Sequence, residues 1–373
     1  MDALTTPSNW QRVRLGDIGK PCMCKRVMKH QTTQYGEIPF YKIGTFGNTA
    51  DAFISKKLFL EYKTKYSFPK KGDILISASG TIGKAVIYDG KPAYFQDSNI
   101  VWIDNDETLV KNDFLFYAYS NIKWNTEHTT ILRLYNDNFR NTLIPLPPLN
   151  EQIAIANVLS DVDHYLYTLD ALILKKESVK KALSFELLSQ RKRLKGFNQN
   201  WQKVRLGDIA NYLTSNLSAE QITQQGKIKV YDVNNFIGYT NTTFISDKPY
   251  ISIVKDGSVG RVRILPPKTN ILSTMGALVA NHKTTTEFLF YLLSNFDFKN
   301  FTSGSIIPHI YFKDYKEKTI FLPPLNEQIA IANVLSALDH EIISLKNKKR
   351  QFENIKKALN HDLMSAKIRV LKK

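Results

Sequence analysis

The chain contains the stretch LPPLNEQIAIANVLS twice, at Leu146–Ser160 and again, letter for letter, at Leu322–Ser336. The two copies are 322 − 146 = 176 residues apart. A second repeat precedes each copy, WQRVRLGDIG from Trp10 and WQKVRLGDIA from Trp201, at a separation of 201 − 10 = 191 residues. The chain is therefore a tandem duplication, and the part between the two repeated stretches is longer in the first copy by 191 − 176 = 15 residues.

Each copy of the longer stretch opens a segment with the periodicity of a long helix. Prolines suit a helix entry, and from Leu149 the first pattern stays helical to about Lys195, where Gly196 is expected to act as the C-terminal stop. Apolar residues step by four or three at Val162, Leu166, Leu169 and Ile173, and resume at Leu183 and Leu187. Adding 176 to each position gives Leu338, Ile342, Leu345, Lys349, Leu359 and Leu363, of which only Lys349 is not apolar. Such a stripe, which repeats about every 3.5 residues, indicates a coiled-coil seam.

Two similar helices in one chain most simply pack on each other. Because a globular domain separates them, an antiparallel arrangement is the easiest closure. Lysines interrupt the seam in mid-course, at Lys176, Lys180, Lys349 and Lys356. We expect the seam there to rely on the neighbouring apolar residues Val179, Phe352 and Ile355.

Residues 1–144 have the pattern of a mixed α/β domain. Candidate strands, separated by Gly, Pro, Asn and Asp, occur at Val13–Leu15, Ile38–Ile43, Asp73–Ser77 and Ala85–Tyr88. A helix is predicted from Asp113, its expected N-cap, and the segment 197–320 repeats the outline with a helix at Glu287. The predicted fold class is α+β, with two mixed α/β domains (1–144 and 197–320). An antiparallel coiled coil of two long repeated helices (145–196 and 321–373) separates them, with pseudo-twofold symmetry.

The composition limits the class of protein. A chain of 373 residues suits two domains with connecting structure, and its formal charge of 51 − 34 = +17 favours a polyanionic partner, nucleic acid first and a membrane surface second. No apolar run has the length of a membrane span, and the N-terminus lacks a signal-peptide pattern. Cys22 and Cys24 form neither a disulfide framework nor a zinc site. A cytoplasmic protein is therefore expected.

The glycine-rich stretch Ser79–Ala85 invites comparison with a phosphate-binding loop but lacks its pattern. Ala78 stands where the first glycine belongs, and Ala85 replaces the required Ser or Thr, so a hairpin turn is the better prediction. No methyltransferase pattern, a cofactor loop with an Asn/Asp-Pro-Pro-aromatic motif, is present. His164 and His340 have too few ligands nearby for a metal site. The sequence thus predicts no catalytic set, no cofactor and no metal.

The remaining candidates are loop residues with chemistry suited to DNA. Arg and Asn read base edges by paired hydrogen bonds, while Lys and hydroxyl groups contact phosphates. In the first domain they are Lys25, Arg26, Lys29, His30, Ser79, Thr81, Lys84, Arg133, Tyr135, Asn136, Asn138 and Arg140. In the second they are Asn234, Asn235, Ser258, Arg261, Arg263, Ser303, Ser305, His309 and Tyr311. Each alone is as easily an ordinary solvated loop residue, but the same loops recur in both domains. The basic helix residues Lys175, Lys176, Lys180 and Lys181 are interpreted as a solvated face.

The order of variable domain, PLPPLNEQ-type entry, long helix, variable domain and repeated helix resembles the specificity subunit of type I restriction–modification systems. The resemblance covers essentially the whole chain. It is most specific in the repeated entries, the WQ-x-VRLGDI starts and GSIIPHIYFKDY. It implies two target recognition domains, each reading a few base pairs of one half of a split double-stranded DNA site. As a departure, the first domain carries LRLYNDNF where the second carries IPHIYFKDY.

The resemblance also implies partners. The paired helices would form the spacer and the docking surface for two modification subunits, with restriction subunits bound outside. Those partners would bind S-adenosylmethionine, methylate adenine and cleave DNA, so this chain would be non-catalytic. The expected docking residues at the helix entries are Pro148, Asn150, Glu151, Gln152, Pro324, Asn326, Glu327 and Gln328.

Helix geometry agrees with this interpretation. About 30 helical residues beyond Ser160, at about 1.5 Å each, form a rod on the order of 45 Å long, somewhat more than one turn of B-DNA at ~34–36 Å. A spacer of fixed length between the half-sites is therefore expected. The alternative function is a stand-alone DNA-binding regulator or anti-restriction protein on the same scaffold, which would bind DNA specifically without modification subunits. The missing motifs argue against an autonomous enzyme.

Overall fold

The computed structural model describes residues 9–125, 127–128 and 132–371. The chain divides into two compact units, unit 1 (Met1–Leu169 with Lys348–Lys373) and unit 2 (Asp170–Asn347). Each unit therefore combines one globular domain with parts of both long helices, whereas the boundaries predicted from the sequence give four consecutive segments. None of the helices among the described residues has both the length and the apolar character needed to cross a membrane.

The two long helices are α5 (Leu149–Leu188) and α8 (Leu325–Met364), each of 40 residues. Both ends of α8 lie 176 residues after those of α5, so the helices repeat as the sequence does. The expected end near Lys195 with a stop at Gly196 is wrong, because α5 ends eight residues before Gly196. The left-handed residue that follows the helix is Gln190, with φ 63°, and Ala366 after α8 has φ 56°.

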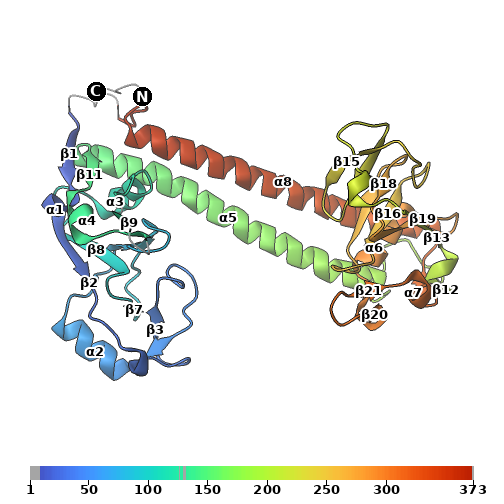
Figure 1. Cartoon of the computed structure of the whole chain (residues 1–373), viewed down its shortest axis with the longest axis horizontal. Coiled ribbons are helices and arrows are strands. Elements are labelled where there is room, and N and C mark those ends of the chain that lie inside the picture. Colours follow the sequence, from blue (N-terminus) through green and yellow to red (C-terminus); the bar gives the residue numbers. More distant parts are fainter. Residues whose placement is uncertain (1–8, 126, 129–131, 372–373) are drawn as a thin grey trace. The chain divides into compact units, whose positions relative to one another are not determined.

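Within each unit, the parts of α5 and α8 pack antiparallel (Figure 1). In unit 1, the rings of Tyr165 and Phe352 lie 4.6 Å apart, and Asp163 forms a 2.5 Å ion pair with Lys356. In unit 2, a later part of α5 meets an earlier part of α8, since Lys176 pairs with Glu341 at 2.8 Å. The expected antiparallel coiled coil is thus confirmed in both units.

The seam is apolar where predicted, with Leu169, Ile173 and Leu187 of α5 and Ile342 and Leu363 of α8 all buried. The prediction for its middle was wrong for two residues, because Val179 and Ile355 are 44% and 51% exposed. The lysines are accommodated by ion pairs instead. Lys176, Lys180 and Lys356 each form an ion pair with a carboxylate of the opposite helix. These ion pairs neutralise the lysine charges, so the apolar neighbours need not cover them.

In unit 1, the first and last strands of the domain pair with each other, and three further sheets lie between them in the sequence. The smallest of the three pairs β9 (Glu127–His128) with β10 (Leu132–Arg133). The outer pair is β1 (Gln11–Arg14) with β11 (Leu143–Leu146). A four-stranded sheet has the order β2 (Gly19–Met23), β8 (Ile100–Asn105), β5 (Ile74–Ser77), β6 (Ala85–Ile87). A three-stranded sheet has the order β4 (Phe53–Ile54), β3 (Ile38–Tyr41), β7 (Tyr94–Phe95). The helices are α1 (Leu15–Ile18), α2 (Lys56–Lys65), α3 (Asn112–Tyr119) and α4 (Asn136–Asn141).

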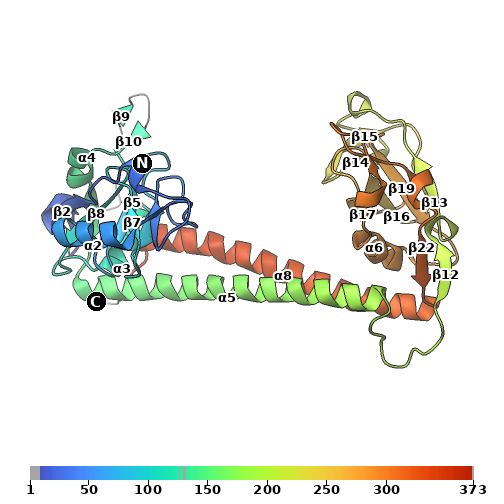
Figure 2. The same ribbon diagram turned by 90° about the horizontal axis from the view of Figure 1, so that it is seen from below.

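Unit 2 repeats this plan. Its outer pair is β12 (Gln202–Arg205) with β22 (Thr319–Leu322). Its four-stranded sheet has the order β13 (Ala210–Thr214), β19 (Met275–Ala280), β16 (Tyr250–Val254), β17 (Val262–Leu265). Its three-stranded sheet has the order β15 (Phe236–Thr240), β14 (Ile228–Tyr231), β18 (Asn270–Ile271). The helices are α6 (Thr286–Ser294) and α7 (Phe312–Tyr315); in Figure 2, α6 lies between the four-stranded sheet and the long helices.

The predicted strands and the predicted domain helices are present in these units, with two errors of detail. Leu15, predicted as the end of the first strand, begins α1. The N-cap of α3 is Lys111, without a side-chain cap, and Asp113 lies in the first turn rather than at the cap. In unit 2, Thr285 caps α6 by accepting a hydrogen bond from the backbone of Phe288. A carboxylate in the first turn still favours the helix, because it faces the positive end of the helix dipole.

The core of each domain extends into the long helices. In unit 1, Trp10 and Phe114 of the domain share one buried cluster with Ile155 of α5 and Leu363 of α8. In unit 2, the matching cluster contains Trp201, Phe288 and Ile331, together with Leu187. Burial of aliphatic and aromatic side chains stabilises such a core at about 25 cal/mol per Å² of apolar surface. Each domain is therefore packed onto the start of one long helix and the end of the other.

Candidate nucleic-acid interface

In unit 1, the stretch 78–84 is the turn between β5 and β6, as the hairpin prediction required. Gly80 and Gly83 have φ 66° and 83°, values that favour glycine. A Cβ at Gly83 would lie 2.1 Å from Nε1 of Trp124, so no other residue fits there. The hydroxyl of Ser77 donates to the carbonyl of Thr81 and accepts from the backbone of Lys84. The turn is therefore rigidly built and presents a defined edge.

Two candidate residues meet at this turn, and a third is held by the same neighbouring segment. Ser79 forms a β-bridge with Arg133, which the sequence places 54 residues later. Both side chains donate to Oδ1 of Asn99, Ser79 from Oγ at 2.8 Å and Arg133 from Nη2 at 3.2 Å. Arg26 reaches the same segment through a 2.8 Å ion pair with Asp97. The segment 97–99 thus connects two of the predicted arginines.

Sequence reasoning missed the segment 97–99. It links β7 to β8, and Ser98 has φ 55°. An available signal was the polar run QDSN between two apolar strands, since Asp, Ser and Asn favour turns through local hydrogen bonds. Its role as an organiser of two arginines depends on contacts that sequence spacing does not reveal.

The other candidates of unit 1 are more dispersed. Lys84 donates from Nζ to the carbonyl of Phe46 at 2.6 Å, and Lys25 lies over the ring of Tyr66, 5.0 Å from its centroid. Exposed candidates without a shared contact among these are Lys29, His30, Thr81, Tyr135, Asn136 and Arg140. The structure therefore brings together Ser79, Arg133 and Arg26, and leaves the remainder as separate surface residues.

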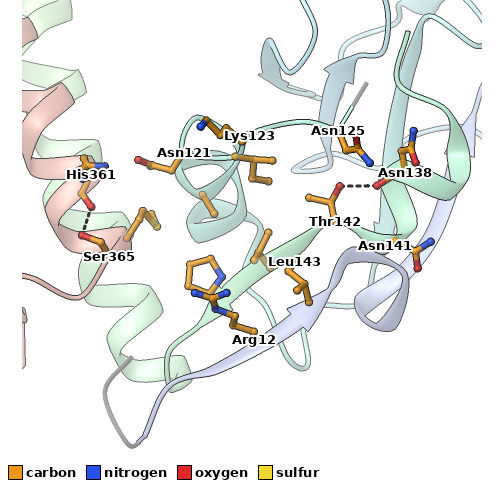
Figure 3. Close-up of a pocket in the computed structure, with 15 residues that line it drawn as sticks. Arg12, Asn121, Lys123, Asn125, Asn138, Asn141, Thr142, Leu143, His361 and Ser365 are labelled. Carbon is orange, nitrogen blue, oxygen red and sulfur yellow. Dashed lines mark hydrogen bonds between the residues drawn. The ribbon is translucent and has the colours of Figure 1, made fainter. Parts of the chain in front are cut away.

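Asn138 lies in a hollow of about 830 Å³ on unit 1, shown in Figure 3. The hollow is rich in amides and cations, namely Asn121, Asn125, Asn138, Asn141, Arg12 and Lys123. Thr142 donates from Oγ1 to the carbonyl of Asn138 at 2.7 Å, which fixes this edge of the hollow. Amide groups offer both donors and acceptors, so the hollow suits a polar ligand without selecting one.

Unit 2 has the same bridge with different residues. Asp256 and His309 pair where Ser79 and Arg133 pair in unit 1. Nδ1 of His309 lies 2.7 Å from Oδ1 of Asp256, and the His309 ring stacks on Tyr311 with centroids 6.5 Å apart. Lys313 lies 5.5 Å from the centre of the Tyr311 ring. A cation and two stacked rings therefore stand at this edge.

A second group in unit 2 surrounds Asn234. Arg261 donates from Nη2 to Oδ1 of Asn234, and Arg263 from Nη1 to its carbonyl, both at 2.8 Å. Arg263 also lies over the ring of Tyr231, 5.3 Å from its centroid. Asp232, which sequence reasoning missed, accepts from the backbones of Asn234 and Asn235 and fixes their loop. Ser258, Ser303 and Ser305 are exposed, and Ser303 ends β20 (Thr302–Ser303).

The expected docking residues at the start of α5 have another role. Glu151 is buried and accepts from Nε1 of Trp10 at 3.0 Å and from Arg369 at 2.5 Å. Gln152 is fully buried and donates to the carbonyls of Leu109 and Pro147. These two side chains hold the domain on the helix and do not reach the surface.

The start of α8 repeats this arrangement. Glu327 accepts from Nε1 of Trp201 at 3.0 Å and from Nε of Arg193 at 3.0 Å, and Gln328 donates to the carbonyl of Pro323. The predicted docking role of Glu151, Gln152, Glu327 and Gln328 is therefore wrong, because these buried side chains cannot contact a partner protein. Pro148, Asn150 and Asn326 are exposed, and Pro324 is half-buried.

A third repeated contact joins each domain helix to the coiled coil. Tyr117 of α3 donates to Asp163 at 2.8 Å, and Tyr291 of α6 donates to Asp339 at 2.8 Å. Burial, reinforced by the neighbouring carboxylate, raises the pKa of both tyrosines above the usual value. Both therefore remain protonated donors at neutral pH.

Other reactive chemistry is limited in the described part of the chain. Burial raises the pKa of Cys24 to about 12, so its thiol stays protonated and is a poor nucleophile. No group of three or more His, Cys, Asp or Glu side chains that could hold a metal ion occurs among the described residues. His164 and His340 are exposed.

Comparisons with known proteins agree on one family. The type I restriction modification DNA specificity domain matches residues 7–176 and 198–354. A protein of Haemophilus influenzae, named as a type I restriction enzyme specificity subunit, is 62% identical over 148 residues. That alignment covers 39% of this chain and 38% of the relative. A protein of Methanocaldococcus jannaschii with the same kind of name is 31% identical over 80% of this chain and 79% of its own.

A solved structure has the same fold. The crystal structure of a type I restriction–modification S subunit from M. genitalium superimposes with a TM-score of 0.63. It covers 97% of this chain and 97% of that one, at 20% sequence identity. At this identity, the likeness concerns the fold alone.

Proposed function

The chain belongs to the type I restriction–modification DNA specificity family, and on this premise we propose that its two units read the two halves of a split double-stranded DNA site. The supporting observation is the repeated β-bridge beside a glycine turn, which carries Ser79 with Arg133 in unit 1 and Asp256 with His309 in unit 2. The backbone is the same and the side chains differ. Two readers with different targets require this combination.

The chemistry of unit 1 suits guanine and phosphate. Arg133 and Arg26 are directed by one polar segment through Asn99 and Asp97, which restricts their rotamers before DNA arrives. Arginine binds the O6 and N7 atoms of guanine with two parallel hydrogen bonds. Preorganised arginines lose less conformational entropy on binding. We therefore assign base reading to this pair, and phosphate contact to exposed lysines such as Lys29.

In unit 2, the proposed readers form two groups. Asn234 with Arg261 and Arg263 offers amide and guanidinium donors on one loop. His309 with Tyr311 offers a ring pair on the other. Because neither group matches its counterpart in unit 1, the two half-sites are expected to differ in sequence.

We also propose that the paired helices set the length of the spacer. A helix rises about 1.5 Å per residue and does not stretch, so a coiled coil fixes a distance. The ion pairs of the seam, such as Lys356 with Asp163 in unit 1 and Lys176 with Glu341 in unit 2, also fix the register of the two helices. A fixed register gives one spacer length rather than a range.

Two modification subunits are the proposed partners, one at each helix entry. Leu149, Asn150 and Ile153 are exposed at the start of α5, and their repeats Leu325, Asn326 and Ile329 are exposed at the start of α8. Identical exposed residues on two helices offer two equivalent docking surfaces. The partners would supply S-adenosylmethionine binding and adenine methylation, and restriction subunits would join the complex, so this chain is non-catalytic.

Methylome sequencing of a strain with and without this gene tests the function. We expect adenine methylation at one bipartite motif with a constant spacer, lost when the gene is deleted. An unchanged methylome would overturn the proposal. In binding assays, the purified chain should bind DNA weakly alone and specifically with its modification subunit, whereas specific binding without that subunit would favour a stand-alone regulator.

A further inference from the structure

The tip of one hairpin in unit 2 is unusually apolar for a surface loop. It joins β20 (Thr302–Ser303) to β21 (His309–Ile310), and its sequence is GSIIP. Ile306 is 92% exposed and Ile307 is 55% exposed. Exposed apolar surface costs about 25 cal/mol per Å², and adjacent exposed aliphatic residues often mark a binding site.

The tip is held rigidly, which distinguishes it from a loose loop. Gly257 donates its backbone N–H to the carbonyl of Pro308, and Ile310 donates to the carbonyl of Lys255, both at 2.9 Å. Gly304 has φ 90°, and a Cβ there would lie 2.3 Å from the carbonyl oxygen of Ile307. The two isoleucines are therefore presented to solvent by a turn that is bonded at its base.

The surroundings of the tip favour a polyanion. His309 and Tyr311, proposed readers, follow the tip directly, and Lys313 lies over the Tyr311 ring. The carboxylate of Asp256 is engaged by His309. The adjoining helix α7 adds one further carboxylate, that of Asp314. The chain as a whole carries a formal charge of +17. A small apolar tip in this setting suits a partner that has an apolar interior and a charged outside.

We propose that Ile306, supported by Ile307, inserts between base pairs of the half-site that unit 2 reads. The inference rests on the proposed function. Aliphatic side chains act as such wedges in other DNA-binding proteins, where they partly unstack a base step and kink the duplex. Two isoleucines are far too few for a stable protein interface, which buries about 800 Å² on each side. A stacked base step, by contrast, offers an apolar surface small enough for one or two isoleucine side chains to cover.

The wedge adds a second kind of readout to unit 2. The cost of opening a step depends on its sequence and is lowest for flexible pyrimidine–purine steps such as TA and CA. Unit 2 would thus prefer a flexible step at the insertion point without hydrogen bonds to its bases. This preference is separate from the contacts of Asn234 and Arg261.

The test uses the complex of this chain with its modification subunits and duplexes of the methylated motif. 2-Aminopurine replaces each purine of both half-sites in turn, because its fluorescence rises when it unstacks. We expect a rise at one step of a single half-site. Any rise at the methylated adenines in both halves belongs to the modification subunits. The double variant Ile306→Ala, Ile307→Ala should lose the single-step rise and bind roughly tenfold more weakly.

Ile87→Ala, an exposed isoleucine of β6 in unit 1, is the matched control and should keep the signal. A double variant with the same single-step rise and affinity as the wild type would overturn the wedge while leaving DNA reading intact. A double variant that no longer assembles with the modification subunits would also overturn it, since the tip would then be a protein contact. Absence of specific DNA binding by the wild-type complex would instead reject the proposed function.

Discussion

The two units are nearly the same where each domain packs on the long helices and different at the proposed DNA interface. Trp10 with Glu151 and Trp201 with Glu327 form the same hydrogen bond at 3.0 Å. At the bridge beside the glycine turn, by contrast, Arg133 is replaced by His309. Packing contacts require fixed shapes and are copied, whereas reading contacts must change for the target to change. The comparison therefore separates the packing contacts from the contacts proposed to read DNA.

The largest expected effect is a change of target. Exchanging residues 1–146 for those of another family member moves β1 and β11 together and leaves unit 2 intact. We expect one half-site to change completely, because specific and non-specific DNA binding differ by about 10³–10⁷. Methylome sequencing measures the outcome. A change in both halves would refute independent reading by the two units.

A deletion in both helices tests whether they determine the spacer. Seven residues, two turns, are removed from each helix between the Asp163–Lys356 and Lys180–Asp339 ion pairs, which keeps both pairs. The helices shorten by about 10 Å, so the spacer should lose about three base pairs. A deletion of seven residues from α5 alone is the control. It should abolish methylation by the complex, because the two helices of the seam would no longer match in length. An unchanged motif after the double deletion would reject the spacer proposal.

The copied packing contact can be broken in either unit. Glu151→Ala leaves the Trp10 indole N–H and the Arg369 guanidinium without their acceptor, and Glu327→Ala does the same to Trp201 and Arg193. We expect each substitution to lower the free energy of unfolding by about 2 kcal/mol, since both arginines keep some contact with water. Urea denaturation measures this.

The exposed residues Asn157 and Asn333, which the repeat also relates, provide matched alanine controls. Their substitutions should change stability by less than about 0.5 kcal/mol. If Glu151→Ala and Glu327→Ala lowered the free energy of unfolding by very different amounts, the two packing contacts would not be energetically equivalent. The expected equivalence of the two units in packing would then be rejected.

The smallest effect concerns single readers. Arg133→Ala should weaken binding and relax selectivity in one half-site, and Arg263→Ala in the other, each by about 1–3 kcal/mol at the affected base pair. Competition with singly mismatched duplexes measures this. Lys91→Ala, an exposed lysine of unit 1, should weaken binding little and uniformly. Loss of selectivity in the same half for both arginine variants would contradict the assignment.

Much of the architecture could be predicted from repeats and periodicity. The helices, their antiparallel pairing and the apolar seam followed from steps of three and four residues, because these put side chains on one face of a helix. The error at Val179 arose because a lysine can stay in a seam when the facing helix supplies a carboxylate, as Glu341 does for Lys176. No spacing within one helix reveals that partner.

The candidate interface was predicted in composition but not in organisation. Arg133, Ser79 and Arg26 were identified as residue types, while Asn99 and Asp97, which direct them, were not. Their contacts join residues 20 to 71 positions apart in the chain. Glu151 was assigned to a partner because it lies in the repeated stretch, yet repetition does not distinguish a docking surface from a packing contact.

The sequence by itself determined the duplication, the two long helices and the basic character of the chain, because identity, periodicity and charge are properties of residue order. Only the tertiary structure decided which repeated side chains are buried and which loops meet. Both depend on contacts between distant segments, and the burial of Glu151 beside Trp10 and the exposure of Ile306 at its hairpin tip are the clearest cases.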